Sequence, residues 1–556
     1  MNQIRAGFNL LRTSGLYPFI ILVSIIWIAL YGYLVSQLEN RLVYIDELVY
    51  FGQWWFDLKA AQMSWINGTI YWEVGSKQPL FFWWFDLLYT ILPQKIAEGP
   101  YFLRLLPRHL SALYVFSVPF FCFFTWHKKD HKILSLALAF CLVLACPFLV
   151  VHAQLSIVEP LLLFLYFAAL LRLHRLLSHP SLFNGLWYGL LCIALLMTKT
   201  SALVPMAGGL LAFALLWAFS QERKRLHALL ALFHAAMIGF AKAYIAMHPE
   251  IQKEQSRFAH FDGLSLALAN NFKNQLIEHL VLLPYYLSYL AIFFLLAAPL
   301  FYWKLNKKAQ TASGTELGAP FVDRSFILVL VCTSAVSYGV ISLLMPYGGA
   351  PRYYLFGFLP LLLLAYRLAL YLLELSMQLP EQRRLKLIWA LVVGVTLADL
   401  YSVQGIFTDP TGQNSRIDPQ DRKQYYTIWA FPSGNALASR MLQNNAVVYG
   451  LGAPYMGDIP KVRMALGIKE GFARTTFLPP TKAEINRLSC NPKFEETLVM
   501  IEPAYWDTQP GEINYDSLEL LYSDKQLEPL PSMTWPVYVY KKRCSLKALS
   551  PTKPLR

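Results

Sequence analysis

The sequence predicts an α-helical polytopic membrane protein with about eleven transmembrane helices and a C-terminal α/β domain outside the cytoplasm. Composition is the first reason: 56% of the 556 residues are hydrophobic and only 15% are charged, too little polar surface for a soluble protein of this size. The second is that apolar runs of about 20 residues recur along the chain, each long enough to cross a bilayer.

These apolar runs define the expected spans. They cover residues 17–39, 109–126, 132–151, 157–171, 183–198, 200–219, 227–247, 279–303, 325–346, 353–375 and 386–407. Basic clusters such as Lys128-Lys129 and Arg383-Arg384 fall in every second loop, so the positive-inside rule places the N-terminus in the cytoplasm. The odd number of spans then places the C-terminal part outside. These loops also account for the net charge of +14, which is therefore no evidence for a nucleic-acid partner.

The chain is expected to consist of a transmembrane module, residues 1–407, and a polar domain, residues 408–556. Within the long outer loop 40–108, the apolar stretch 80–92 predicts a short helix lying at the membrane interface. In the polar domain, strands are expected at 447–449, 497–501, 518–521 and 537–540, and helices at 433–442 and 481–488. This mixture predicts a small α/β domain.

An acidic pair, Asp46-Glu47, follows the first span at its outer end. Carboxylates at the point where a helix leaves the membrane are well placed to act on a group held in lipid. Neighbours on a helix diverge by about 100°, so we expect only one of the two to face a given atom. The alternative is a pair that caps a loop helix, because carboxylates favour helix N-termini.

Further charges of both signs fall at the outer ends of spans. Glu159 begins the fourth span, where a lone carboxylate is costly without a partner, and Lys199 lies in the next tight outer turn. Arg352 precedes a late span, and an arginine at a helix start suits phosphate. Arg104 and Arg108 lie one turn apart just before the second span. The alternatives are a carboxylate at a helix N-terminus and basic side chains that contact lipid headgroups.

Together these residues resemble the C-type glycosyltransferases (GT-C), membrane enzymes that use polyprenyl-phosphate-linked sugars. Within that class the resemblance is to the bacterial aminoarabinose transferases that act on lipid A and to their protein mannosyltransferase relatives. Those families carry an Asp-Glu pair in the first outer loop, matched here by Asp46-Glu47. An Asn-Gly and a Tyr-x-Glu-Lys-Pro-type segment follow, matched by Asn67-Gly68 and by Tyr71-Trp-Glu73-Val-Gly-Ser-Lys77-Gln-Pro79. The extra residues between Glu73 and Lys77 depart from the family pattern.

Three further motifs extend the resemblance over about the first 380 residues. Arg104 to Ser111 approximates an Arg-x-Pro-Ser segment, and Glu159 takes the second acidic position, which is usually Asp. Pro351-Arg352-Tyr353, followed by Tyr354, matches a late Pro-(Arg/Lys)-Tyr motif. The order and the common sidedness of the motifs carry the resemblance, since each motif alone is weak.

The resemblance implies an inverting transfer of a sugar from undecaprenyl phosphate to lipid A, a glycan or a protein, on the periplasmic side of a bacterial inner (plasma) membrane. It implies Asp46, Glu47 and Glu159 as catalytic residues, with Asp46 as general base. The implied substrate-binding residues are Glu73, Lys77, Arg104, Arg108, Lys199, Arg352, Tyr353 and Tyr354. Basic groups among them would stabilise the leaving phosphate. A divalent metal is left open, since carboxylates meet phosphate but no ligand spacing demands one.

Other functions stay open at this point. A membrane transporter differs in its expected internal repeats and midplane site, and the sequence shows no repeat. An oligosaccharide transferase of the same class differs only in the size of the donor head group, and an inactive scaffold would keep the fold alone. Lys242 and Asp399 lie inside expected spans, and the sequence assigns them no role.

Cysteine placement adds one candidate bond. Cys490 and Cys544 are the only cysteines of the expected outer domain, whereas the other five lie in apolar runs. In an oxidising periplasm the two are candidates for a disulfide, and the alternative is a pair of free thiols.

Overall fold

The computed structural model describes most of the helical part of the chain and a smaller share of its C-terminal part. The described residues are 16–38, 48–55, 58–59, 61–64, 66, 68, 71–72, 74, 77–127, 131–155, 157–249, 251–252, 283–296, 321–344, 354–378, 383–408, 431–451, 458–478, 491–501, 527–529 and 538–542. Contacts divide the chain into two units. Unit 1 comprises Met1–Leu38, Tyr71–Trp84 and Arg108–Tyr426, and unit 2 comprises Glu39–Ile70, Phe85–Pro107 and Thr427–Arg556.

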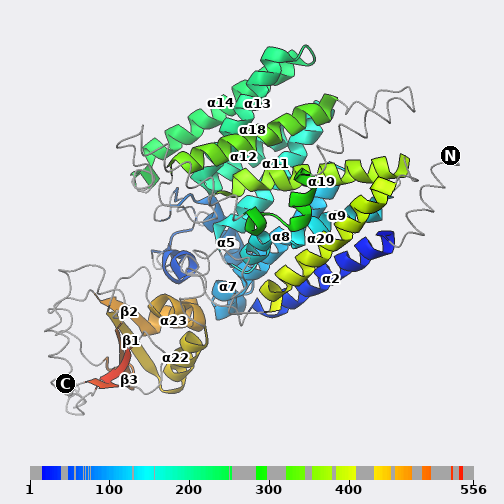
Figure 1. Cartoon of the computed structure of the whole chain (residues 1–556). Helices are drawn as coiled ribbons and strands as arrows, with labels where there is room; N and C mark the ends of the chain where they lie inside the picture. Colours follow the sequence, from blue (N-terminus) through cyan, green and yellow to red (C-terminus); the bar gives the residue numbers. More distant parts are fainter. Residues whose placement is uncertain are drawn as a thin grey trace, which may run out of the picture. The chain divides into compact units, whose positions relative to one another are not determined.

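Unit 1 is helical (Figure 1). Its helices are α2 (Leu16–Ser36), α8 (Leu106–Thr125), α9 (Lys132–Leu144), α10 (Pro147–His152), α11 (Val158–Ser178), α12 (Leu182–Thr198), η4 (Thr200–Ala202), α13 (Leu203–Phe219), α14 (Lys224–Met247), α18 (Phe321–Leu344), α19 (Leu355–Gln378) and α20 (Arg383–Thr408). Helix α5 (Leu80–Ile91) lies where a short loop helix was expected. Among the described residues, six helices are long and apolar enough to cross a membrane, so the membrane fold is confirmed and the number of eleven spans stays a prediction.

Among the expected spans that differ from the helices in the structure are 132–151 and 157–171. The run 132–151 is interrupted at Ala145 and Cys146, and α10 restarts with Pro147 as its first residue. Proline has no N–H to continue the preceding helix but suits the first position of a new one, which explains the break. Helix α11 continues to Ser178, beyond the predicted end at 171, because its last turns still bury leucine side chains.

Unit 2 contains a five-stranded mixed sheet with the strand order β2-β1-β3-β5-β4. The strands are β1 (Ala446–Leu451), β2 (Thr475–Leu478), β3 (Glu496–Ile501), β4 (Leu527–Pro529) and β5 (Tyr538–Lys542). Strand β1 runs parallel to β2 and β3, in register Val448 with Thr475 and Leu498, and β5 is antiparallel to both β3 and β4. Three of these strands lie where strands were expected; the expected elements at 481–488 and 518–521 lie outside the described residues.

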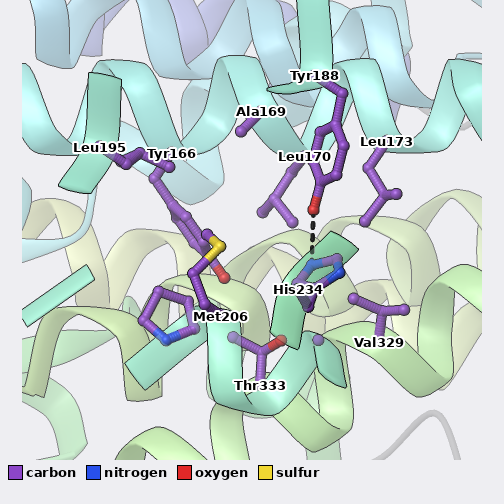
Figure 2. A pocket seen from close by; sticks show the side chains of 12 residues that line it. Tyr166, Ala169, Leu170, Leu173, Tyr188, Leu195, Met206, His234, Val329 and Thr333 are labelled. Atoms are coloured by element: carbon purple, nitrogen blue, oxygen red, sulfur yellow. Dashed lines mark hydrogen bonds between the residues drawn. The ribbon is translucent and has the colours of Figure 1, made fainter. Parts of the chain in front are cut away.

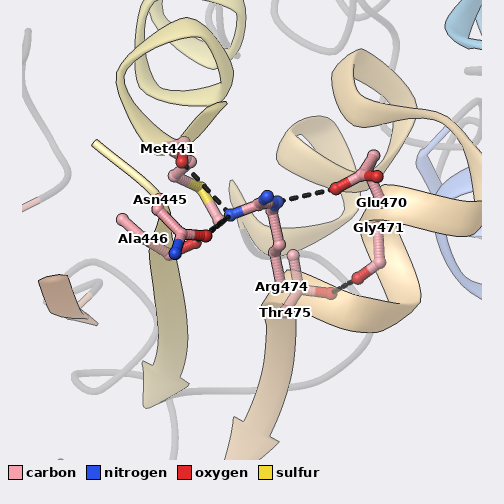
Figure 3. A network of polar contacts seen from close by, with 7 residues as sticks. All are labelled: Met441, Asn445, Ala446, Glu470, Gly471, Arg474 and Thr475. Carbon is pink, nitrogen blue, oxygen red and sulfur yellow. Dashed lines mark hydrogen bonds and ion pairs between the residues drawn. The ribbon is translucent and has the colours of Figure 1, made fainter. Parts of the chain in front are cut away.

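Helices α22 (Phe431–Gln443), α23 (Asp458–Leu466) and α24 (Ile468–Arg474) accompany the sheet. Side chains of α22, β1, α23 and β3, among them Met441, Val448, Val462 and Leu498, form one buried core. Figure 3 shows how the Arg474 guanidinium links three of these elements. It donates to the Glu470 carboxylate at 2.7 Å, to the Met441 carbonyl at 3.3 Å and to the Ala446 carbonyl at 3.2 Å.

Unit 2 also includes segments that precede α8. They are the π-helical segment η2 (Leu48–Trp55), α6 (Gln94–Ala97) and α7 (Pro100–Arg104). Helix α23 packs against η2 and α7, and the Phe51 ring meets Phe85 edge to face at 4.8 Å. Aromatic pairs of this geometry add to the stabilisation from burial. Part of the predicted loop 40–108 therefore belongs to the same unit as the C-terminal sheet.

Candidate functional site

Two of the predicted site residues in unit 1, Glu159 and Lys199, form an ion pair. Glu159 lies in the first turn of α11, and Lys199 is the extended residue that caps the end of α12. The two helices pack together, and Lys199 Nζ donates to Glu159 Oε1. Glu159 is 1% exposed, so the ammonium offsets the cost of burying its carboxylate. The structure thus brings together an anionic and a cationic side chain that the sequence had singled out separately.

Lys77 lies on a tight turn that ends just before α5. Val74 and Lys77 pair as an antiparallel bridge, with N–H to carbonyl distances of 2.9 and 3.0 Å. This bridge lies in the stretch between Glu73 and Lys77 that departs from the family pattern. Two aromatic donors hold the preceding segment: Trp83 Nε1 donates to the Tyr71 carbonyl at 3.0 Å, and the Tyr244 hydroxyl donates to the Trp72 carbonyl. Residues 71 and 72, just before this turn, are therefore held by α5 and α14.

Arg108 has a contact that accounts for its burial. The residue is 1% exposed, and its Nη1 donates to the carbonyl of Leu38 at 2.8 Å, just beyond the end of α2. A cation at a helix C-terminus satisfies a carbonyl that the helix leaves unpaired and interacts favourably with the helix dipole. This contact gives Arg108 a structural role. Arg104 is the last residue of α7, in unit 2, and it is also buried.

Tyr354 immediately precedes α19 and is fully buried. Its ring lies 5.8 Å from Tyr338 and 6.4 Å from Tyr286, measured between ring centroids. Tyr286 in turn stacks on Phe358 at 4.0 Å with nearly parallel planes. Tyr354, two residues after the predicted phosphate-binding Arg352, is therefore anchored in an aromatic cluster.

Several predicted site residues lie outside the described part of the chain. They are Asp46, Glu47, Glu73, Arg352, Tyr353, Cys490 and Cys544. Their roles stay predictions, and the candidate disulfide is untested. Among the described residues, no group of three or more His, Cys, Asp or Glu side chains is arranged to hold a metal ion.

The structure assigns a role to Asp399, which the sequence left without one. Its carboxylate, buried inside α20, accepts hydrogen bonds from the backbone N–H groups of Tyr289 and Leu290, both at 2.9 Å. Residues 289–296 are helical, so the carboxylate caps the start of this helix. A single acid in an otherwise apolar span was the available signal, but the partner, in another predicted span, could not be read from the sequence.

Sequence reasoning also missed an ion pair in unit 2. Lys59 Nζ donates to the Asp86 carboxylate and lies over the rings of Trp55 and Tyr89, at 4.3 and 4.8 Å from their centroids. Asp86 is 1% exposed, and burial together with the Glu98 carboxylate raises the pKa of Tyr89. The spacing of Lys59 and Asp86 along the chain carries no recognisable signal. The aromatic rings around the cation add a cation–π attraction to the pair.

Comparisons with known proteins give a fold. No protein-family model matches the chain, and no curated protein matches it. Among solved structures, ArnT from Cupriavidus metallidurans bound to undecaprenyl phosphate is similar, with a TM-score of 0.53 and 13% identity over 93% of this chain and 97% of that chain. The same protein in the apo state gives a TM-score of 0.48, with the same identity and coverage. The chain therefore has an ArnT-like membrane fold along nearly its whole length, and at 13% identity the likeness is one of fold.

Proposed function

We propose that this chain is an integral-membrane inverting glycosyltransferase that moves a sugar from a polyprenyl phosphate, undecaprenyl phosphate in a bacterium, to lipid A, another glycan or a protein. The observation that carries the proposal is the ArnT-like fold over 93% of the chain, because the similar structure is of a protein bound to undecaprenyl phosphate. The order of the sequence motifs supports the same class independently.

The proposed reaction is a single displacement at the anomeric carbon of the donor sugar. The acceptor hydroxyl oxygen forms a bond to that carbon while the bond from the carbon to the phosphate oxygen breaks. The polyprenyl phosphate leaves with the electron pair, and the Asp46 carboxylate takes the hydroxyl proton as general base. Glu47 is proposed to position the groups around Asp46.

The leaving phosphate gains negative charge as the bond breaks, so cations placed in advance lower the barrier. We assign this task to Lys77, Arg352 and Lys199, with Arg104 as a further candidate. The bridge that ties the Lys77 backbone to Val74 supports its assignment, because a positioned cation need not reorganise during the reaction. Lys199 has three ammonium N–H groups, and one of them donates to Glu159. In this role Glu159 keeps the lysine charged and oriented.

The sidedness belongs to the proposal as well. We place the N-terminus in the cytoplasm and assign residues 1–407 to the catalytic transmembrane module. Residues 408–556 form the periplasmic domain, in which Cys490 and Cys544 pair. The alternation of basic loops supports this orientation. Thiol labelling of single-cysteine variants in intact cells tests the sidedness, and mass spectrometry of unreduced peptides tests the disulfide.

The deciding experiment incubates the purified full-length protein with a panel of undecaprenyl-phosphate sugars and follows donor-dependent labelling of lipid A and protein. We expect transfer from at least one monosaccharide donor and its loss in Asp46→Asn at normal expression. Transfer from oligosaccharide donors alone would assign the chain to oligosaccharide transferases. Substrate uptake into proteoliposomes without any transfer would make it a transporter. If neither transfer nor uptake is found, the chain is an inactive scaffold that keeps the fold.

A further inference from the structure

Five helices of unit 1 line a small cavity, and none of the predicted site residues is part of its lining. It lies among α11, α12, α13, α14 and α18, and has a volume of about 20 Å³ (Figure 2). Most of its lining is apolar, but the side chains of Tyr166, Tyr188, His234 and Thr333 also line it. Tyr166 lies eight residues into α11, roughly 12 Å along the helix axis, so the cavity is deep inside the membrane module.

Two glycines of α13 give the cavity its shape. A Cβ atom on Gly209 would lie 2.4 Å from His234 Nε2, and one on Gly208 would lie 2.4 Å from the Thr333 Cα. A larger residue at position 208 would push α18 away from α13, and one at position 209 would displace the His234 ring. This close approach places His234 against the backbone of α13 and keeps α18 close to α13.

The hydrogen bonds of His234 fix the direction of its bond to Tyr188. His234 Nδ1 lies 2.7 Å from the Leu230 carbonyl, which can only accept, so Nδ1 carries the proton. In a neutral ring Nε2 is then an acceptor, and the Tyr188 hydroxyl, 2.9 Å away, donates to it (Figure 2). The Tyr188 hydroxyl proton thus lies in the bond to His234, while the lone pairs of the Tyr188 oxygen can still accept a hydrogen bond.

The Tyr166 hydroxyl has a different environment. The residue is 3% exposed, and its hydroxyl has no hydrogen-bond partner within the part of the chain that the structure describes. A buried hydroxyl left without a partner destabilises the fold, because its lost hydration is not replaced. A cavity of this volume holds one water molecule, and buried waters typically make about three hydrogen bonds.

We propose that the cavity is a binding site for one ordered water molecule. The water accepts a hydrogen bond from the Tyr166 hydroxyl and donates to the hydroxyl oxygens of Tyr188 and Thr333. It thereby joins α11 to α12 and α18. A lipid methyl group or an empty cavity would leave the Tyr166 hydroxyl unsatisfied. The inference does not depend on the proposed enzymatic activity.

The test is a double-mutant cycle on the full-length protein in detergent, read as thermal unfolding. Tyr166→Phe and Thr333→Val each keep the shape of the side chain and remove one partner of the water. We expect each to lower the melting temperature by about 2 °C. Because both act through the same water, the double variant should lose clearly less than the sum of the two. Tyr188→Phe, which removes a direct bond to His234, shows that the assay detects the loss of one hydroxyl here.

Two outcomes overturn the proposal. An unchanged or raised melting temperature in Tyr166→Phe would show that the hydroxyl has no ligand, because removing an unsatisfied polar group costs nothing. Additive effects of Tyr166→Phe and Thr333→Val would show that the two side chains do not share a water. A density map that resolves ordered waters elsewhere in the protein should also show a peak between the two side chains.

Discussion

The backbone N–H of Ile468 donates a hydrogen bond to the carbonyl of Glu98 at 2.9 Å. This bond joins α24 of the C-terminal part to the segment between α6 and α7 within unit 2. The approach is possible because Gly467, just before Ile468, has a φ of +82°, and a Cβ there would lie 2.5 Å from the same carbonyl oxygen. Only glycine combines this conformation with so close a contact.

Gly467→Ala should therefore destabilise unit 2. The strained φ and the clash with the Glu98 carbonyl together should cost about 1–3 kcal/mol. The measurement is thermal unfolding of the full-length protein, with limited proteolysis to locate the affected part. Gly394→Ala is the control, because a Cβ at that position in α20 meets nothing within 4 Å. Equal stability of the two variants would contradict the described contact.

The ion pair of Glu159 and Lys199 should show strong coupling. Glu159→Gln and Lys199→Met should each destabilise the protein by about 3–5 kcal/mol, because each leaves a buried charge without its partner. The double variant should lose less than the sum, and its deficit measures the coupling.

Glu470→Gln is the matched control for this cycle. Glu470 pairs with Arg474 four residues later, but its side chain is 39% exposed. An exposed pair of this kind contributes only about 0.3–0.5 kcal/mol. A comparable loss at Glu159 and Glu470 would mean that the Glu159 pair is hydrated rather than buried.

The secondary structure was largely predictable from local patterns. Apolar runs predicted the helices of unit 1, and β-branched and aromatic residues predicted β1, β3 and β5. Strand β4 was not predicted, because it has only three residues, one of them Pro529, and forms a strand only by pairing with β5. Pro147 was a local signal for the break before it. Because apolar residues lie on both sides of the break, the sequence predicted one span where the structure has two helices.

The members of the Glu159–Lys199 pair were predictable from the sequence, but their contact was not. Charge at the predicted outer ends of spans singled out the two residues, since burial there demands a partner. Their direct pairing depends on the packing of α11 against α12, which periodicity does not specify. The pair of Lys59 and Asp86 had no pattern at all, because its geometry arises from the tertiary arrangement of the loop.

Asp399→Ala should loosen the helix over 289–296. The change removes the acceptor for the N–H groups of Tyr289 and Leu290, and losing such a cap costs about 1–2 kcal/mol. Hydrogen exchange followed by mass spectrometry should show faster exchange in peptides that cover 289–296. Ser402→Ala, in the same helix as Asp399, is the control, since its hydroxyl donates to the backbone carbonyl of Asp399 at 3.2 Å and its removal leaves the Asp399 carboxylate in place. Unchanged exchange in Asp399→Ala would rule out the capping role.

Glu496 should make unit 2 sensitive to acid. Burial by itself raises the pKa of its carboxyl, but hydrogen bonds from Arg440, Lys541 and Asn444 outweigh burial and hold the pKa below its ordinary value of 4.5. The Arg440 and Lys541 nitrogens lie 2.8 and 3.1 Å from Glu496 Oε1. Because the folded pKa is the lower one, the carboxylate stabilises the fold fully above the unfolded pKa. That stabilisation is lost as the pH falls through the folded value.

The measurement is the unfolding of unit 2 within the full-length protein between pH 7 and pH 3. We expect stability to fall over the acidic part of this range, and Glu496→Gln to be less stable at pH 7 but flatter with pH, because the amide neither ionises nor pairs with both cations. Glu495→Gln is the matched control, since Glu495 is next to Glu496 in the chain but its side chain is exposed. If Glu496→Gln kept the full acid dependence of the parent protein, the three hydrogen bonds would not be the source of that dependence, and other carboxylates would have to be.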